Sequence, residues 1–335
     1  MFEFGSKNVV FIAPDFFGYD LIIEKALSDS GANVYRLVDR PFSGAIYKAI
    51  SKFFGNIVSK ILENYYLSKL NKHNVSADYV LVINGQTLSR KTLLTLKSEN
   101  PNAKFILYLW DSLKNRPTII RNLDIYDEKF SFDREDSQKY GLKFRALFYG
   151  DSEENETLNH KSDRYLMSFV GTAHSDRYAI VSALKPNFKD HDCFWYLYLQ
   201  ASWVYWWYKI TNSAFSGAMK NDFMYSSLQY SEMRRVFNQS EIIVDIEHES
   251  QVGLTIRTFE CMHSGKKMVT TNKDIINYDF YRYGNIFLID RDSPAVPEEF
   301  INRPFSPYSK DVIKFYSVDT WIKDVLSLTG VSDDQ

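Results

Sequence analysis

The chain has 335 residues and a mass of 39.2 kDa, with 45% hydrophobic and 24% charged residues, which is typical of a soluble protein with two domains of about 150 residues each. A net charge of −2 argues against a general nucleic-acid binder, which needs a basic field. The chain has only two cysteines, which argues against a disulfide framework. No apolar run approaches the ~20 residues needed to span a bilayer, which argues against a membrane span. We therefore expect a cytoplasmic protein.

The first half of the chain alternates between predicted strands and helices. The run "NVVFIA" at 8–13 is continuously apolar, as in a strand buried on both faces of a parallel sheet. Helical periodicity follows in "DLIIEKALSDSG", which ends at Gly31, and then in "SRKTLLTLKSENP" at 89–101. Further strands are predicted at 33–39, 78–85 and 104–111. This alternation predicts a doubly wound parallel sheet in a first domain of residues 1–160.

A lysine-rich amphipathic segment lies within this domain. Five lysines and one acid accompany apolar residues at helical spacing through residues 46–72. Such a helix can lie on an anionic membrane surface. It can equally pack on the sheet with a solvated lysine face, and the sequence leaves both interpretations open.

The βα pattern restarts after a polar segment at 151–164, which predicts a second domain of residues 161–335 whose last helix can cross back to the first. Its strands are expected at 165–172, 193–199, 241–246, 266–271 and 285–290. The fold class is therefore α/β, with two Rossmann-like βα domains. Residues 193–210 hold four of the six tryptophans and predict either a membrane- or acceptor-facing patch or a buried strand and helix.

Two glycine-containing turns in the second domain suggest phosphate binding. In "FVGT", Gly171 follows a strand and precedes a helix, where backbone N–H groups can hold phosphate, although an ordinary turn also uses glycine. In "GLTIRTFE", Gly253 precedes a helix that Thr255 can cap. Arg257 and Glu260 are three positions apart on that helix, so they form an ion pair or contact the diphosphate and ribose of a nucleotide.

These motifs, "FVGT…SDR" and "D-I-x-H-x-x-x-Q-x-G-L-T-x-R-x-F-E…G-K-K-x-x-T-T-N", resemble GT-B-type glycosyltransferases of bacterial surface-polysaccharide and lipopolysaccharide biosynthesis and, more distantly, the CgeB-like group. The resemblance covers residues 165–292. It implies that the two domains face a cleft, with a nucleotide-sugar donor in the second domain, a glycan or glycolipid acceptor in the first, and neither a cofactor nor a metal. It also implies that any membrane contact of residues 46–72 is with the cytoplasmic face of the inner membrane. It also implies donor contacts from Gly171, Thr172, His248, Glu249, Gln251, Gly253, Leu254, Thr255, Arg257 and Glu260.

The reaction expected from this resemblance is an inverting sugar transfer. Glu249 and Glu260 are eleven positions apart, whereas retaining GT-B enzymes space two glutamates eight apart. Inversion needs a general base, for which Asp15 is the first candidate and Asp111 the second. Asp15 could instead cap the next helix, and Asp20 competes for both roles. A polyol-phosphate transferase and a non-catalytic nucleotide- or sugar-binding protein remain alternatives, and the triplets "DHD" and "DRD" at 190–192 and 290–292 are interpreted as loop acids.

Overall fold

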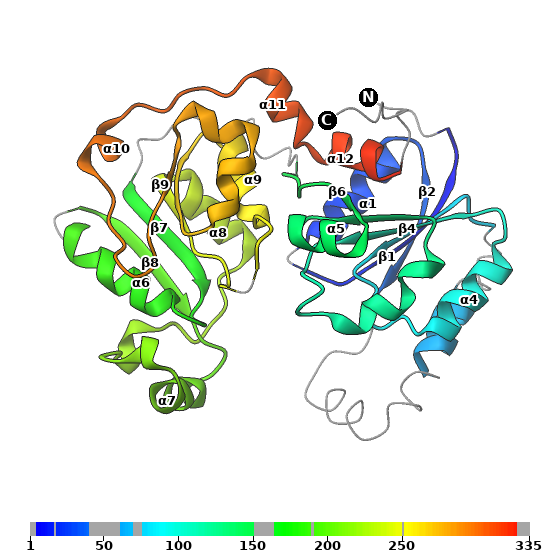
Figure 1. The fold of residues 1–335 in the computed structure, drawn as a ribbon, viewed down its shortest axis with the longest axis horizontal. Helices are drawn as coiled ribbons and strands as arrows, with labels where there is room; N and C mark the ends of the chain where they lie inside the picture. The colour runs from blue at the N-terminus through cyan, green and yellow to red at the C-terminus, as the bar shows by residue number, and fades with distance from the viewer. Residues whose placement is uncertain are drawn as a thin grey trace. The chain divides into compact units, whose positions relative to one another are not determined.

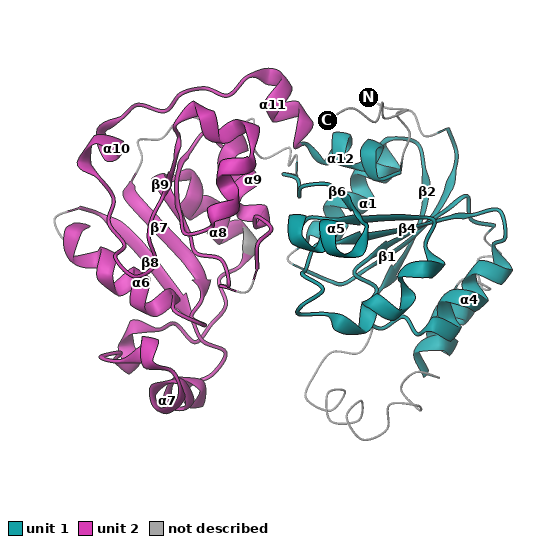
Figure 2. Ribbon diagram, viewed as in Figure 1, with its two compact units in different colours: residues 1–150, 317–335 teal, residues 151–316 magenta. Residues whose placement is uncertain are grey.

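The computed structural model describes residues 5–16, 18–39, 61–69, 76–150, 164–188, 191–249 and 251–326. The chain forms two compact units (Figure 2). Unit 1 consists of Met1–Gly150 and Ser317–Gln335, and unit 2 of Asp151–Tyr316. The predicted α/β class is confirmed, because each unit contains a parallel sheet flanked by helices (Figure 1).

Unit 1 contains a six-stranded parallel sheet in the order β2-β1-β3-β4-β5-β6. Its apolar runs form the central strands because their side chains are buried on both faces. β1 pairs in register with β2 on one side and with β3 on the other. The strands are β1 (Asn8–Ala13), β2 (Asn33–Val38), β3 (Tyr79–Ile83), β4 (Lys104–Leu109), β5 (Glu128–Ser131) and β6 (Lys143–Phe144).

The α-helices labelled in unit 1 are α1 (Tyr19–Asp29), α4 (Arg90–Glu99), α5 (Arg134–Tyr140) and α12 (Val318–Val325), and a 3-10 helix, η1 (Pro117–Ile125), lies between β4 and β5. Helix α12 lies far along the chain yet packs against α1 (Figure 1). Trp321 of α12 is fully buried, with its ring 4.6 Å from that of Tyr108. Arg145 donates from Nε to Asp324 over 2.7 Å, so an apolar and an ionic contact together hold this helix on unit 1.

Of the amphipathic segment predicted at 46–72, the structure describes residues 61–69 as a helix, and the remainder lies outside the described residues. Leu62 and Tyr66 of this helix belong to the core of unit 1. The Tyr66 hydroxyl also lies 2.8 Å from the hydroxyl of Thr87. Over 61–69 the helix therefore packs on its unit, as the second interpretation expects.

Unit 2 contains a five-stranded parallel sheet in the order β11-β10-β9-β7-β8. Strand β7 lies between β8 on one side and β9, the central strand, on the other. The strands are β7 (Tyr165–Thr172), β8 (Cys193–Tyr198), β9 (Ser240–Asp245), β10 (Lys267–Thr270) and β11 (Ile286–Leu288).

The α-helices of unit 2 are α6 (Arg177–Leu184), α7 (Ser202–Thr211), α8 (Tyr230–Asn238), α9 (Ile256–His263), α10 (Glu298–Asn302) and α11 (Lys310–Phe315). Short 3-10 turns join them: η3 (Lys185–Phe188), η4 (Ser213–Phe215), η5 (Lys220–Asp222), η6 (Lys273–Asn277) and η7 (Asp279–Tyr283). Within the described ranges, no helix combines the length and apolar character needed to cross a bilayer.

Candidate functional site

The strand order of unit 2 identifies a topological switch point at its carboxyl edge. After β7 the chain adds β8 on one side of it, and later adds β9 on the other side. Ligands of open α/β sheets bind at such a switch point, beyond the carboxyl ends of the strands. Gly171 and Thr172 end β7, while the other predicted donor residues follow β9, in the loop after Asp245 and in α9. The fold therefore brings the predicted donor residues to one edge of the sheet.

Asp245 anchors the start of α9 to this edge. Its side chain is only 2% exposed and accepts hydrogen bonds from Arg257 Nη1 at 2.8 Å and from Thr255 Oγ1 at 2.9 Å. Arg257 donates through Nη2 to the Val170 carbonyl at 2.7 Å. Its third donor, Nε, is buried and has no hydrogen-bond partner among the described residues. Arg257 thus ties α9 to both β9 and β7.

Among the residues that the structure describes, no side-chain hydrogen bond caps the amino terminus of α9. Thr255 occupies the N-cap position, as predicted, but its hydroxyl donates to Asp245 and accepts no hydrogen bond from the first turn. The first-turn N–H groups of a helix need acceptors, and together with the helix dipole they favour an anion. The helix ends before Gly265, whose φ of 64° is in the left-handed region that favours glycine.

Arg177 joins the two loops that flank the switch point. Its Nε donates to the Ile246 carbonyl at 2.7 Å and its Nη1 to the Thr172 carbonyl at 3.1 Å. Burial, reinforced by the positive charge of Arg257, lowers the pKa of Arg177 to about 10, so it remains a cation at neutral pH. The sequence contained Arg177 in the "SDR" of the resemblance, but we did not predict it as a site residue.

Neighbouring side chains leave no room for a side chain at Gly171. A Cβ at this position would lie 2.9 Å from Phe169 Cζ and 3.4 Å from Arg177 Nη1. The Phe169 ring is fully buried and cannot move aside cheaply. This packing accounts for the glycine whether or not its N–H contacts a phosphate.

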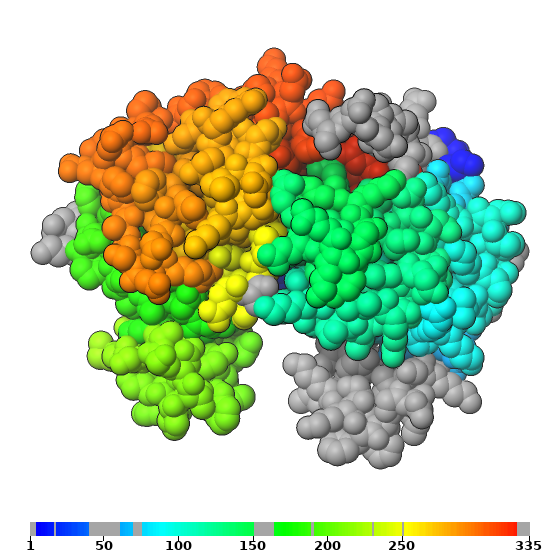
Figure 3. Space-filling model, in the orientation of Figure 1, coloured from blue at the N-terminus to red at the C-terminus, as the bar shows by residue number. Residues whose placement is uncertain are grey.

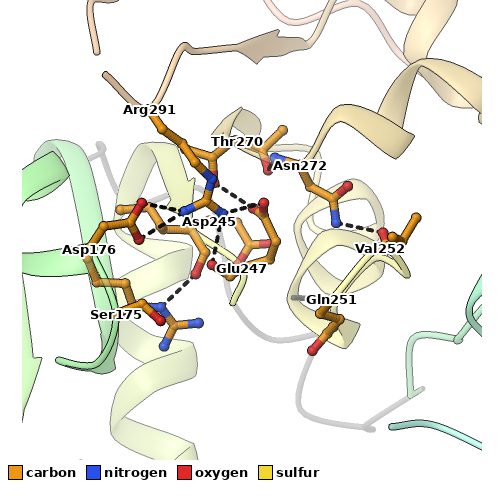
Figure 4. Close-up of polar contacts among 12 residues, drawn as sticks. Ser175, Asp176, Asp245, Glu247, Gln251, Val252, Thr270, Asn272 and Arg291 are labelled. Atoms are coloured by element: carbon orange, nitrogen blue, oxygen red, sulfur yellow. Dashed lines mark hydrogen bonds and ion pairs between the residues drawn. The ribbon is translucent and has the colours of Figure 1, made fainter. Parts of the chain in front are cut away.

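A second ionic cluster, drawn in Figure 4, lies at the same edge of the sheet. Arg291 donates through Nη1 to both carboxylate oxygens of Asp176, at 2.9 and 2.7 Å, and through Nη2 to the carbonyl and the carboxylate of Glu247. Glu247 is buried and also accepts from the Thr271 hydroxyl. Burial opposes the charge of Arg291, but its bonds to the two carboxylates raise its pKa.

The "DRD" triplet therefore contains a residue that the sequence analysis missed. Asp290 is a loop acid, as expected, and accepts from the backbone N–H groups of Asp292 and Ser293. Arg291 between the two acids is the residue that reaches the site. Its position directly after the strand "NIFLID" is a signal that could have indicated this.

Two histidines contact each other at this edge of the sheet. The ring centroids of His174 and His248 are 5.2 Å apart, and His174 Nδ1 lies 3.2 Å from the Ser175 hydroxyl. Burial, together with the charges of Arg177 and His248, lowers the pKa of His174 to about 3. His174 is therefore neutral at physiological pH, and its imidazole can accept or donate a hydrogen bond.

The loop that carries the remaining predicted residues is fixed by amide side chains. Gln251 donates from Nε2 to the Gly253 carbonyl at 3.0 Å. Asn272, which follows β10, donates to the Val252 carbonyl at 2.9 Å (Figure 4). Gly253 and Leu254 are buried, Glu249 is exposed, and Glu260 lies one turn into α9 and is partly exposed. Asn272 was the last residue of the quoted motif, but we did not predict it as a site residue.

The two candidate bases lie at the carboxyl edge of the sheet in unit 1. Asp15 is exposed, just beyond β1, and no side chain caps α1, whose N-cap is Gly18. Asp111 follows β4 and accepts from Arg116 Nε at 2.8 Å. Asp20 is fully buried and pairs with Arg36, which gives it a structural role.

Within the described ranges, no group of three or more His, Cys, Asp or Glu side chains is arranged to hold a metal ion.

No protein-family model matches the sequence, and a comparison with curated proteins found no match. Solved structures do share the fold. MurG of Acinetobacter baumannii matches with a TM-score of 0.51 and 9% identity over 96% of this chain and 100% of that chain. The UDP-GlcNAc 2-epimerase of Neisseria meningitidis, bound to UDP-GlcNAc, matches with a TM-score of 0.54 and 11% identity over 96% of this chain and 100% of that chain. At these identities the likeness shows the fold, the two-domain GT-B architecture predicted from the sequence.

Proposed function

We propose that the protein is a glycosyltransferase that uses a nucleotide-diphosphate sugar as its donor. The observation that carries this proposal is the uncapped amino terminus of α9 at the β7–β9 switch point of a GT-B fold. The fold neighbour from Neisseria meningitidis is bound to a nucleotide-diphosphate sugar, which supports this class of donor.

In the proposed donor complex, the diphosphate contacts the first-turn N–H groups of α9 and the backbone at Gly171 and Thr172. Arg257 contributes positive charge and fixes the helix end through Asp245. Glu260 accepts from the ribose hydroxyls, while the loop of His248, Glu249, Gln251, Gly253, Leu254 and Thr255 faces the phosphates and the sugar.

The proposed chemistry is an inverting displacement that needs neither a metal nor a cofactor. A carboxylate of unit 1 removes the proton from an acceptor hydroxyl, whose oxygen attacks the anomeric carbon. The charge that develops on the departing diphosphate is stabilised by the α9 terminus, which is already oriented before reaction. Asp15 is the better candidate base, because Asp111 is already held by Arg116.

We further propose that the acceptor is a growing surface glycan or glycolipid, as in lipopolysaccharide or polysaccharide biosynthesis, and that the enzyme works in the cytoplasm. Peripheral membrane contact through residues 46–72 belongs to this proposal. Among the described residues of that segment, Leu62 and Tyr66 are committed to the core, which leaves the exposed positions such as Ile61 and Lys69 for such a contact.

Nucleotide screening tests the donor assignment. Thermal shifts with UDP, GDP, dTDP, ADP, CMP and their sugars should identify one stabilising nucleoside diphosphate. If none stabilises the protein, the donor assignment is wrong. Product analysis then separates the reactions: a nucleoside diphosphate with a glycosylated acceptor indicates transfer, a monophosphate indicates polyol-phosphate transfer, and an epimerised sugar indicates epimerisation. Binding without turnover by any acceptor would favour a non-catalytic sugar-nucleotide binder.

A further inference from the structure

Helix α7 carries a stripe of large apolar side chains that unit 2 leaves exposed. Trp203, Trp206, Trp207 and Ile210 are 69%, 58%, 60% and 84% exposed. At 100° per residue these four positions fall within an arc of about 100° on the helix surface. We call this set the α7 stripe.

The opposite face of α7 holds the helix on its unit. Val204 and Tyr205 are buried, and the Tyr205 hydroxyl donates to the Ala218 carbonyl at 3.0 Å. The Tyr208 ring lies 4.9 Å from that of Phe215 in the core. The fold is therefore anchored by other side chains, and the α7 stripe is left as a contiguous exposed apolar surface, which indicates a binding surface.

The charge around α7 favours an anionic lipid surface. The sequence contains no Asp or Glu between Asp192 and Asp222, but it contains Lys209 and Lys220, both exposed. Lys209 also donates from Nζ to the Ala218 carbonyl and keeps its positive charge. Indole rings combine an apolar body with one N–H donor and concentrate at membrane interfaces, and flanking lysines are attracted to anionic headgroups. A second copy of this chain would instead bring together two copies of residues 193–221, which contain lysines and no Asp or Glu, and repulsion disfavours this.

We propose that the α7 stripe docks into the interface of a bilayer containing anionic phospholipid. Helix α7 follows the carboxyl end of β8, so it lies at the same sheet edge as the candidate donor site. Figure 1 shows α7 beyond the lower end of that sheet, and Figure 3 shows its segment, in light green, protruding from unit 2.

The end of α7 is also bonded to the donor side of the unit. Asn212, which caps α7, donates from Nδ2 to the Ser175 carbonyl at 2.8 Å. Ser175 lies in the loop after β7 and has a φ of 52°. Docking through the α7 stripe would therefore hold the carboxyl edge of unit 2 close to the lipid headgroups, where a membrane-embedded glycolipid acceptor presents its sugar.

The test uses the full chain and vesicles of phosphatidylethanolamine and phosphatidylglycerol, without any nucleotide, so its outcome is independent of the donor proposal. Co-sedimentation measures binding, and phosphatidylglycerol brominated on its acyl chains quenches tryptophans that reach the interface. The wild type should co-sediment and be quenched, and binding should weaken on vesicles of phosphatidylcholine alone. A variant with serine at positions 203, 206 and 207 should bind at least about tenfold more weakly, because binding scales with buried apolar area.

Leu94→Ser is the matched control, since Leu94 is an exposed apolar residue on α4 in the other unit. Trp206→Glu is a second variant, which should also bind more weakly and keeps the test decisive if the triple variant does not fold. Unchanged vesicle binding by a folded stripe variant overturns the proposal and points to residues 46–72. A dimer in lipid-free sedimentation that the stripe variants abolish also overturns it, because the stripe would then be a subunit interface.

Discussion

Replacing Asp245 by Asn should destabilise unit 2 substantially. Asparagine preserves the shape of the side chain and one acceptor oxygen, but it removes the charge that faces Arg257 Nη1 at 2.8 Å. The Arg257 side chain is 18% exposed and retains its bond to the Val170 carbonyl. Removing one partner of a buried ion pair costs 3–5 kcal/mol, and this partial exposure places the expected loss at about 3 kcal/mol.

Native-state hydrogen exchange of the amides in β9 and α9 measures this loss within unit 2. A melt of the whole chain would not, because two-domain proteins depart from two-state unfolding. Asp245→Asn, Arg257→Met and the double variant form a double-mutant cycle. The control is Glu299→Gln, which breaks an exposed ion pair with Arg303 and should cost less than about 0.5 kcal/mol.

The two single losses should not add in the double variant. We expect a coupling of about 2 kcal/mol, because each substitution removes the same interaction. If the two single losses add to the loss of the double variant within about 0.5 kcal/mol, the Asp245–Arg257 pair does not hold α9 on β9. Binding of UDP and of uridine by Arg257→Met then separates two roles of the arginine: a loss confined to UDP indicates contact with the diphosphate, whereas equal losses indicate that Arg257 acts by positioning α9.

Three further predictions concern single positions. Gly171→Ala should cost about 1–3 kcal/mol, because its Cβ would meet the Phe169 ring at 2.9 Å, and should weaken UDP binding in calorimetry. His174 remains neutral in the fold down to about pH 3 but protonates near pH 6.5 when unfolded, so stability present above pH 6.5 should be lost as the pH falls. Native-state hydrogen exchange of the amides in β7 should show this loss, and a smaller loss in His174→Gln. Lys267→Met should destabilise unit 2 by about 3 kcal/mol, because this buried lysine pairs with Glu241 and donates to three backbone carbonyls at the end of α10. Hydrogen exchange of the amides in β10 measures this loss.

The central strands were predictable because burial on both faces requires continuous apolar runs, as in β1 and β4. The strands β5 and β6 were not predicted. Their sequences, "EKFS" and "KF", are short and mixed in polarity, and only the pairing of β5 with β4 and of β6 with β5 places them in the sheet. Local sequence therefore identified the strands that carry their own hydrophobic signal and missed those that depend on a neighbour.

The candidate site shows the same division between local and long-range information. Motif spacing indicated which loops lie at the carboxyl edge of the sheet. Helix spacing, however, suggested only partners for Arg257 within one turn of the helix. In the structure Arg257 pairs with the carboxylate of Asp245, twelve positions earlier in the chain. Arg291 contacts Asp176, 115 positions away. Such pairs depend on the order of the strands in the sheet, and local sequence patterns do not reveal that order.

The positive and negative side chains at the carboxyl edge of the unit 2 sheet compensate one another. This balance determines which groups would attract an anion there. Among the described residues, Arg257 is paired with Asp245, and Arg291 is shared between Asp176 and Glu247. Arg177 bonds backbone carbonyls and lies within the field of the same acids. A diphosphate would therefore meet a nearly neutral frame, in which oriented N–H groups at the start of α9 supply most of the attraction. Because a fixed frame of dipoles needs no reorganisation as charge moves onto the leaving group, the same arrangement suits the transition state better than mobile surface charges would.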